Sequence, residues 1–174
     1  MKFNSNGNIR ELVQQYGEYI YHLAYLYVKN KESAEEIAQD VFYTFSRKHH
    51  QFRGNAQLKT YLTRMAINRS HDELRKLKRK AILESVLPFL KNEPSAEAHV
   101  MKEQEGTTLM SAVLALPIHY REAIILHYYK DYSVIEMTNL LQTSEHTIRT
   151  RLRRAKELLK KELGEQMEVA LSYE

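Results

Sequence analysis

Hydrophobic residues recur along most of the chain at intervals of three and four positions, which is the spacing of one face of an α-helix. This spacing predicts long helices over residues 8–29, 33–48, 58–82 and 145–163. Short runs of alternating hydrophobic and polar residues, which are typical of half-buried strands, do not occur in the sequence. We therefore predict an all-α fold.

Helix starts are marked by polar residues that can cap the free backbone N–H groups. Ser33 with Glu36 and Ser133 with Glu136 have the spacing of a capping box, and Ser144 is placed to cap the last helix. Pro117 suits the first turn of a helix because its missing N–H is not needed there. These signals predict several short helices between residues 107 and 144.

One segment in the middle of the chain has a different character. Residues 85–106 contain Pro88, Pro94 and Gly106, have no sustained hydrophobic period and carry a net charge of −2. Such a composition is typical of a linker. We expect two small helical domains, residues 1–84 and 107–174, joined by this flexible linker.

The positive charge is concentrated in two segments that are helical in pattern. The whole chain has a formal net charge of +4, but residues 69–80 carry +4 and residues 145–161 carry +5, which leaves the remainder of the chain at −5. A single basic segment is often only a solvated helix face. Two of them favour a polyanionic partner, because binding to phosphates releases condensed counterions.

The composition argues against several classes of protein. The chain has no cysteine, which excludes disulfides and Cys-ligated metals, and its eight histidines do not have the HExxH spacing of a zinc enzyme. No hydrophobic run approaches the roughly 18 residues of a membrane span, and the N-terminus has no hydrophobic signal core. We expect a protein of the cell interior with no cofactor, no metal, no catalytic residues and no small-molecule substrate.

The C-terminal pattern is that of a helix-turn-helix, with a short helix over residues 133–141, a tight turn and then a basic helix. In the last helix, at about 100° per residue, Ile148, Leu152, Ala155 and Leu159 cluster on one side. The opposite side carries Arg149, Thr150, Arg153 and Arg154. We expect this side to read duplex DNA in the major groove, where arginine can bind guanine with two hydrogen bonds. Arg151 and the lysines that follow it are expected to face phosphates or solvent.

The first domain carries a second, weaker nucleic-acid signal. A polar loop precedes a helix whose second half is basic, and loops beside basic helices can hold unstacked bases. The candidate residues are Phe52 and Asn55 in the loop and Arg64, Asn68, Arg69, Asp72 and Arg75 on the helix.

Three separate blocks of the sequence resemble one known family. They are SAEEIAQDVFYTF from residue 33, YLTRMAINRSHDELRKLKRK from residue 61 and LPIHYREAIILHYYKDYSVIEMTNLLQTSEHTIRTRLRRAKELL from residue 116. In this order and spacing they are similar to the polymerase-binding helix, the minus-ten segment and the minus-thirty-five domain of extracytoplasmic-function (ECF) sigma factors of bacterial RNA polymerase. The resemblance covers nearly the whole chain.

The resemblance implies roles for individual residues. Those expected to contact core RNA polymerase are Glu36, Gln39, Asp40 and Phe42. Those expected to recognise the melted minus-ten strand are Asn68 and its neighbours Arg64, Arg69, Asp72, Arg75, Phe52 and Asn55. Those expected at the minus-thirty-five duplex are Arg149, Thr150, Arg153, Arg154 and His146.

The resemblance also implies partners and a location. It implies a cytoplasmic protein that performs no bond chemistry itself, binds core polymerase and promoter DNA, and is held by an anti-sigma factor that is often membrane-bound. Its departures from the family pattern include Tyr61 in place of tryptophan, Gln142 where glycine is common in the turn, and His146 in place of glycine. The promoter sequence and the inducing signal are not specified.

Three other classes of protein are alternatives. A stand-alone dimeric regulator would need an effector or receiver domain, and residues 1–84 lack the alternating strand and helix pattern of a receiver. Such a regulator would shift its operator in a gel without polymerase, whereas a sigma factor alone should bind poorly. An enzyme would need more than the exposed pair His49–His50, and a membrane-surface helix would need a hydrophobic face rich in Trp or Phe.

Overall fold

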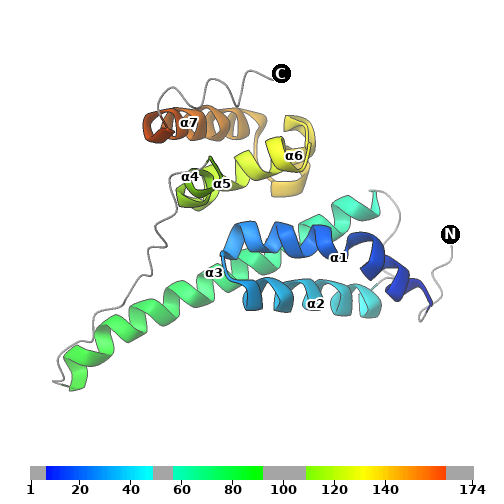
Figure 1. The fold of residues 1–174 in the computed structure, drawn as a ribbon, viewed down its shortest axis with the longest axis horizontal. Helices are drawn as coiled ribbons and strands as arrows, with labels where there is room; N and C mark the ends of the chain where they lie inside the picture. Colours follow the sequence, from blue (N-terminus) through cyan, green and yellow to red (C-terminus); the bar gives the residue numbers. More distant parts are fainter. Residues whose placement is uncertain (1–6, 49–56, 92–108, 164–174) are drawn as a thin grey trace. The chain divides into compact units, whose positions relative to one another are not determined.

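The computed structural model describes residues 7–48, 57–91 and 109–163. These residues are helical with short connections, and none of them lies in a β-strand. The predicted all-α fold is therefore confirmed. In chain order the elements are α1 (Gly7–Val28), α2 (Lys31–Lys48), α3 (Leu58–Lys91), α4 (Leu109–Ala115), α5 (Ile118–Ile124), the π-helical segment η2 (Ile125–Tyr129), α6 (Val134–Leu141) and α7 (Glu145–Leu163) (Figure 1).

The helices form two compact units, as the sequence predicts. The first unit contains α1, α2 and α3 from Met65 onwards, and the second contains α4 to α7 together with the start of α3 as far as Arg64. The predicted boundaries at residues 84 and 107 remain predictions, and most of the predicted linker lies outside the described residues.

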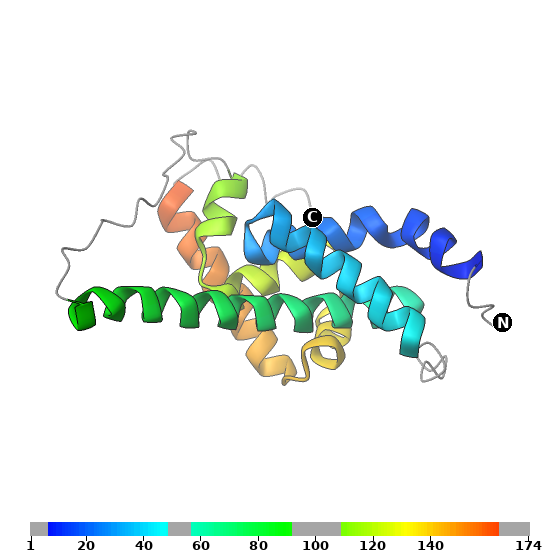
Figure 2. The same ribbon diagram turned by 90° about the horizontal axis from the view of Figure 1, so that it is seen from below.

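In the first unit, α1 and α2 run antiparallel and lie side by side (Figure 1, Figure 2). Hydrophobic side chains from one face of each helix fill the interface. They are Ile20, Leu23, Ala24 and Tyr27 from α1 and Ala34, Ile37, Val41, Phe42 and Phe45 from α2. Burial of each large side chain stabilises the pair by about 1.5–3 kcal/mol, and it leaves the polar face of α2 exposed.

The cap of α2 differs from the prediction. The helix begins at Lys31, so Ser33 lies inside its first turn rather than before it. The cap is Asn30, whose Oδ1 accepts a hydrogen bond from the backbone N–H of Ser33 at 2.8 Å. Asparagine caps a helix as well as serine does. The sequence prediction chose Ser33 because Ser33 and Glu36 have the spacing of a capping box.

The C-terminal end of α3 also differs from the prediction. The helix was expected to end near Ile82, with a linker from residue 85, but it continues to Lys91 and includes Pro88. Residues 81–87 contain Ala, Leu and Glu, which are strong helix formers, and no glycine. Their propensity favours a helix that extends past Ile82.

The second unit is arranged around α7, which packs against α4, α5 and α6. The residues predicted to face inward are all buried: Ile148, Leu152, Ala155 and Leu159. The turn between α6 and α7 requires the left-handed conformation at Gln142, with φ of 51° and ψ of 48°. Glycine adopts this conformation at no steric cost, so the glutamine holds the same turn under some strain.

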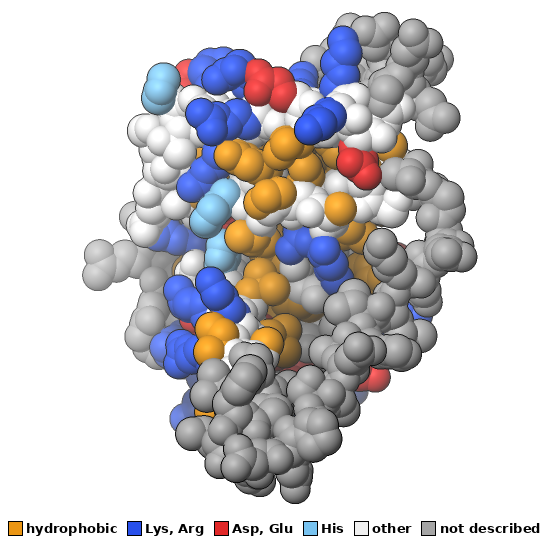
Figure 3. All heavy atoms as spheres, turned by 90° about the vertical axis from the view of Figure 1, so that its left-hand side faces the viewer, with side chains coloured by type: hydrophobic (Ala, Val, Ile, Leu, Met, Phe, Trp, Pro, Cys, Tyr) orange, Lys and Arg blue, Asp and Glu red, His pale blue; other side chains and the backbone are white. Residues whose placement is uncertain are grey.

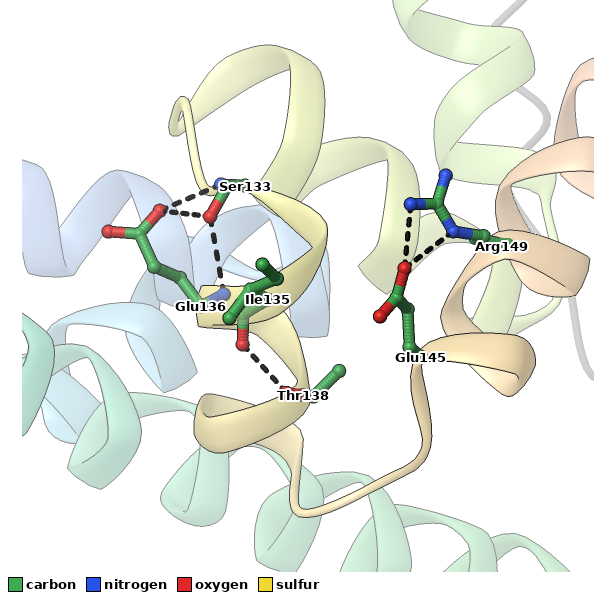
Figure 4. A network of polar contacts seen from close by, with 6 residues as sticks. All are labelled: Ser133, Ile135, Glu136, Thr138, Glu145 and Arg149. Carbon is green, nitrogen blue, oxygen red and sulfur yellow. Dashed lines mark hydrogen bonds and ion pairs between the residues drawn. The ribbon is translucent and has the colours of Figure 1, made fainter.

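The predicted capping box at the start of α6 is confirmed (Figure 4). The Glu136 N–H donates to Ser133 Oγ at 3.2 Å, and Glu136 Oε2 accepts from the Ser133 hydroxyl at 2.7 Å and from the Ser133 N–H at 2.8 Å. The hydrogen bond from the Ser133 side chain, followed by that from its backbone, lowers the pKa of the Glu136 carboxyl. Ionised Glu136 therefore favours the folded state.

This box predicts a pH-dependent effect of Glu136→Gln. Because the pKa is lower in the folded state, the carboxylate stabilises the fold above the pKa of the unfolded chain, and this contribution is lost as the pH falls through the folded pKa. We expect the substitution to lower the free energy of unfolding by about 0.5 kcal/mol at pH 7, a small value because the group is exposed. The difference between the two proteins in urea titrations should shrink as the pH falls towards 3. Exposed Glu162→Gln is the control, and a difference for Glu136→Gln that grows towards pH 3 would contradict the assignment.

Candidate nucleic-acid interface

Helix α7 presents two faces of opposite character. Its buried stripe begins with Ile148, which is 0% exposed, whereas Arg149 and Arg153 on the other side have side chains that are 66% and 64% exposed. Arg154 is also exposed and Thr150 is half-buried. The structure thus brings the predicted reading residues together on one outward face, with His146 exposed at the start of the helix.

The start of α7 is fixed by its cap and by the preceding turn. The Ser144 side chain accepts a hydrogen bond from the Thr147 N–H at 3.1 Å, as predicted for an N-terminal cap. Before it, the backbone N–H of Thr143 donates to the Thr138 carbonyl at 3.2 Å, which closes the end of α6. Together these bonds set the angle between the two helices of the helix-turn-helix.

Two of the arginines that are predicted to read DNA are paired with acidic residues of their own helix. Arg149 donates from Nε and Nη2 to Glu145 Oε1, at 2.8 and 2.6 Å (Figure 4). Arg153 Nη1 lies 2.7 Å from Glu157 Oε1. Exposed pairs of this kind contribute only about 0.3–0.5 kcal/mol. A guanine edge or a phosphate can therefore replace the carboxylate at little cost.

Arg151 does not face phosphates or solvent as expected. Its Nη1 lies 3.5 Å from Oε2 of Glu122 on α5, and the two side chains are 21% and 3% exposed. On a helical wheel Arg151 lies only about 40° from buried Ala155, at 100° per residue. That angle could have indicated that Arg151 is partly buried. Its acidic partner, Glu122, is 29 positions earlier in the sequence, so the periodicity of α7 does not reveal it.

A groove lies beside the predicted reading face of α7, between the start of α5 and the first half of α7. Its volume is about 420 Å³. It is lined by Pro117, His119, Tyr120, His146, Thr147, Thr150, Arg151 and Arg154. Three of the predicted reading residues therefore share this groove with residues of α5 that the sequence did not single out.

The predicted minus-ten residues lie on α3, with two exceptions. Asn68, Arg69, Asp72 and Arg75 are exposed and Arg64 is half-buried. Asp72 and Arg75 form an ion pair with each other. The remaining two candidates, Phe52 and Asn55, lie outside the described residues.

Part of this set adjoins the predicted polymerase-binding residues. A cleft of about 130 Å³ is lined by Glu36 and Asp40 of α2 and by Arg69 and Asp72 of α3, among others. Arg69 Nη1 lies 3.9 Å from Asp40 Oδ2, and its Nη2 donates to Thr44 Oγ1 at 3.3 Å. The two predicted sites therefore meet at the α2–α3 boundary, which the separate motifs did not reveal.

The other residues predicted to bind polymerase differ in exposure. Gln39 is exposed on the same face of α2 as Glu36 and Asp40. Phe42 is only 6% exposed and packs in the core of the first unit. Its side chain offers almost no surface to a partner, so any contribution to docking would come from its position in the core beneath the polar face.

Surface charge agrees with a polyanionic partner. On the one face that Figure 3 draws, the Lys and Arg side chains are more prominent than those of Asp and Glu. Among the described residues there is no group of three His, Asp or Glu side chains placed to bind a metal ion. None of the described helices combines the length and the hydrophobicity of a membrane-spanning segment.

Comparison with known families gives two matches in the expected order. Residues 12–80 match the family described as Sigma-70 region 2, and residues 107–159 match Sigma-70, region 4. Together these matches cover more than half of the chain.

Individual proteins are similar over most of their length. The chain is 29% identical to the ECF RNA polymerase sigma factor SigW of Bacillus subtilis, over 88% of this chain and 87% of the relative. It is 28% identical to SigM of the same organism, over 87% and 93%.

Two solved structures share the fold. The sigma factor RpoE of Bartonella quintana, in complex with the anti-sigma factor NepR, has a TM-score of 0.66 at 20% identity, over 87% of this chain and 94% of that one. CnrH, in complex with the cytosolic domain of CnrY, has a TM-score of 0.64 at 20% identity, over 91% of each chain.

The buried Glu122–Arg151 pair predicts a stability effect that exposed arginines should not show. Arg151→Met keeps most of the side-chain length but leaves the Glu122 carboxylate with one ion-pair partner fewer in a buried position. We expect the free energy of unfolding to fall by about 1–3 kcal/mol, measured by urea titration. Arg154→Met, on the exposed face of the same helix, should change it by less than about 0.5 kcal/mol. Equal effects of the two substitutions would show that the pair does not anchor α7.

Proposed function

The chain belongs to the ECF-type sigma-70 family of RNA polymerase sigma factors, and we propose how its residues divide between polymerase and promoter DNA. It is not an enzyme: it binds RNA polymerase and directs transcription initiation at promoters. The observation that carries the residue assignment is the outward basic face of α7, held in place by the buried stripe on its other side.

We propose that α7 reads the minus-thirty-five duplex in the major groove. Arg149, Arg153 and Arg154 are the side chains long enough to reach base edges, with Thr150 available for a base or a thymine methyl group. Among the described residues Arg154 has no carboxylate partner, so its guanidinium needs no exchange before it binds DNA.

The exposed face of α3 is proposed to capture the opened minus-ten strand. Asn68 can pair with a base edge through its amide, and Arg64 and Arg75 can hold phosphates nearby. Unstacking a base costs a few kcal/mol, which contacts of this kind must offset. Arg69 and Asp72 also adjoin the face of α2 that is proposed to bind polymerase. Polymerase bound to α2 would therefore lie next to these two side chains.

The polar face of α2 is proposed to dock on core polymerase. Glu36, Gln39 and Asp40 are exposed there over a rigid hydrophobic core. An acidic face of this kind suits a partner surface that carries basic residues.

We further propose a cytoplasmic protein that an anti-sigma factor holds inactive. The similar folds of RpoE with NepR and of CnrH with the cytosolic domain of CnrY support this idea. The surface that would bind the anti-sigma factor is not assigned.

Loss of one reading arginine should relax specificity at one base position. For Arg149→Ala or Arg154→Ala we expect the free-energy preference for the correct base to fall by about 1–3 kcal/mol at a single minus-thirty-five position. Run-off transcription with core polymerase on genomic fragments first identifies the promoter, and base substitutions at each position then locate the effect. Lys161→Ala, in the last turn of the same helix, is the control. Full discrimination at every position by both arginine variants would reject the assignment.

Strand opening should depend on Asn68. Asn68→Ala removes the amide that is proposed to hold a base, so we expect weaker permanganate reactivity of minus-ten thymines in the holoenzyme complex, with duplex binding retained. Gln15→Ala, which removes an exposed amide from α1, is the control and should give minus-ten thymines the same permanganate reactivity as the wild type. A footprint of wild-type strength for Asn68→Ala would count against the proposed capture.

A further inference from the structure

The outward face of α7 carries negative charge as well as positive charge. Arg149, Arg153 and Arg154 are exposed there, and Glu145 and Glu157 lie beside the first two of them. Each glutamate is four residues from its arginine, which is about 40° around the helix at 100° per residue. A duplex that approaches the three arginines therefore also approaches the two carboxylates.

The arginines of α7 differ in how firmly carboxylates hold them. Arg151 is paired with Glu122 where both side chains are largely buried. Arg149 and Arg153 are paired with the glutamates of their own helix where all four side chains are at least half exposed (Figure 4), and such pairs are weak. Among the described residues, no carboxylate is paired with Arg154. Exchange with DNA is therefore open to Arg149 and Arg153, but it needs a partner that binds them better than a carboxylate does.

A phosphate and a guanine edge differ as replacements for the carboxylate. A phosphate is another solvated anion, so its attraction for an arginine resembles that of the glutamate that it would displace. A guanine edge accepts two hydrogen bonds from one guanidinium in a fixed geometry within the major groove. The pairing therefore opposes phosphate contacts, which any sequence offers, more than it opposes the correct base contacts.

The two pairs also reduce the general electrostatic attraction to DNA. Affinity for DNA of any sequence depends on the number of phosphates that the protein neutralises. An arginine whose charge is already neutralised by a carboxylate adds little to this number. With both pairs closed, Arg154 is the one of the three exposed arginines that contributes its full charge.

We propose that Glu145 and Glu157 are specificity-determining residues, which keep Arg149 and Arg153 from phosphates of arbitrary sequence and release them to the correct bases. The proposal rests on the proposed reading role of α7. It assigns the carboxylates an opposing role: they lower the affinity for arbitrary DNA more than they lower the affinity for the cognate minus-thirty-five duplex.

The first test measures how the full chain without polymerase binds a duplex of arbitrary sequence. Fluorescence anisotropy at several salt concentrations gives the affinity and its salt dependence. We expect Glu145→Gln and Glu157→Gln each to raise the affinity about 3- to 8-fold at about 0.1 M salt, and to steepen the slope of log K against log salt by about 0.9, because each frees one arginine for a phosphate.

The control for the change in net charge is Glu162→Gln, which removes an exposed carboxylate from the last turn of the same helix. It should change the affinity less than about 2-fold, because salt screens an exposed charge that holds no arginine. Glu145 lies in the first turn of α7, where its charge also interacts with the helix dipole. Glu157→Gln repeats the test away from that end.

A double substitution shows whether the effect depends on the paired arginine. In Arg149→Ala, Glu145 has no guanidinium to hold, so adding Glu145→Gln should raise the affinity for arbitrary DNA by less than about 2-fold. Adding Glu157→Gln should have the same effect as in the wild type. A gain from Glu145→Gln that is as large without Arg149 as with it would show simple charge repulsion and would overturn the proposal.

Holoenzyme assembled from core polymerase and the full chain tests specificity. In either glutamate variant, binding to the cognate promoter should rise by less than about 2-fold, because the pair that the bases displace is weak. Binding to a promoter with a replaced minus-thirty-five element should rise by about 3- to 8-fold, so discrimination falls. If Glu145→Gln instead changes the preferred base at one position and leaves the salt slope unchanged, the carboxylate reads a base directly and the proposal is overturned.

These results also separate the proposal from the one on which it rests. If both glutamate variants behave like Glu162→Gln while Arg149→Ala and Arg154→Ala lose base discrimination, the role of the carboxylates fails and the reading role of α7 stands. If the two arginine variants keep full discrimination, the reading role itself fails.

Discussion

The hydrophobic stripe of α7 determines which way its basic residues face. Ile148, Leu152 and Leu159 are buried against the other helices of the second unit, and each contributes about 1.5–3 kcal/mol. Turning the helix by half a turn would expose this stripe and place arginines in the core, where unpaired charges are very costly. The direction in which the basic face of α7 points is therefore set by hydrophobic burial of the opposite face.

The acidic residues of α7 adjust how readily that face meets DNA. Glu145 and Glu157 hold two of the arginines in the free protein, and each exposed pair is weak enough to be exchanged. In the free protein part of the charge of each of these two arginines is therefore screened by its carboxylate partner.

Much of the second unit could be predicted from the sequence, because its signals are local. The buried stripe of α7, the Ser133–Glu136 capping box and the cap at Ser144 each depend on residues within a few positions of one another. The missed features depend on choices between similar signals or on distant partners. Asn30 and Ser33 are both good caps, and helix propensity favours the extension of α3 past Ile82. The Glu122–Arg151 pair and the groove beside it join residues about 30 positions apart, which no periodic pattern reports.

The orientation of α7 on the promoter is the central claim, and site-specific crosslinking tests it most directly. The natural chain has no cysteine, so Arg153→Cys and Leu158→Cys each introduce a single thiol, at two exposed positions on different sides of α7. Each variant is labelled with a photoactivatable reagent and assembled with core polymerase on promoter DNA. The account predicts crosslinks to the minus-thirty-five duplex from position 153 and few or none from position 158. Crosslinks of equal strength from both positions, or stronger ones from position 158, would contradict it.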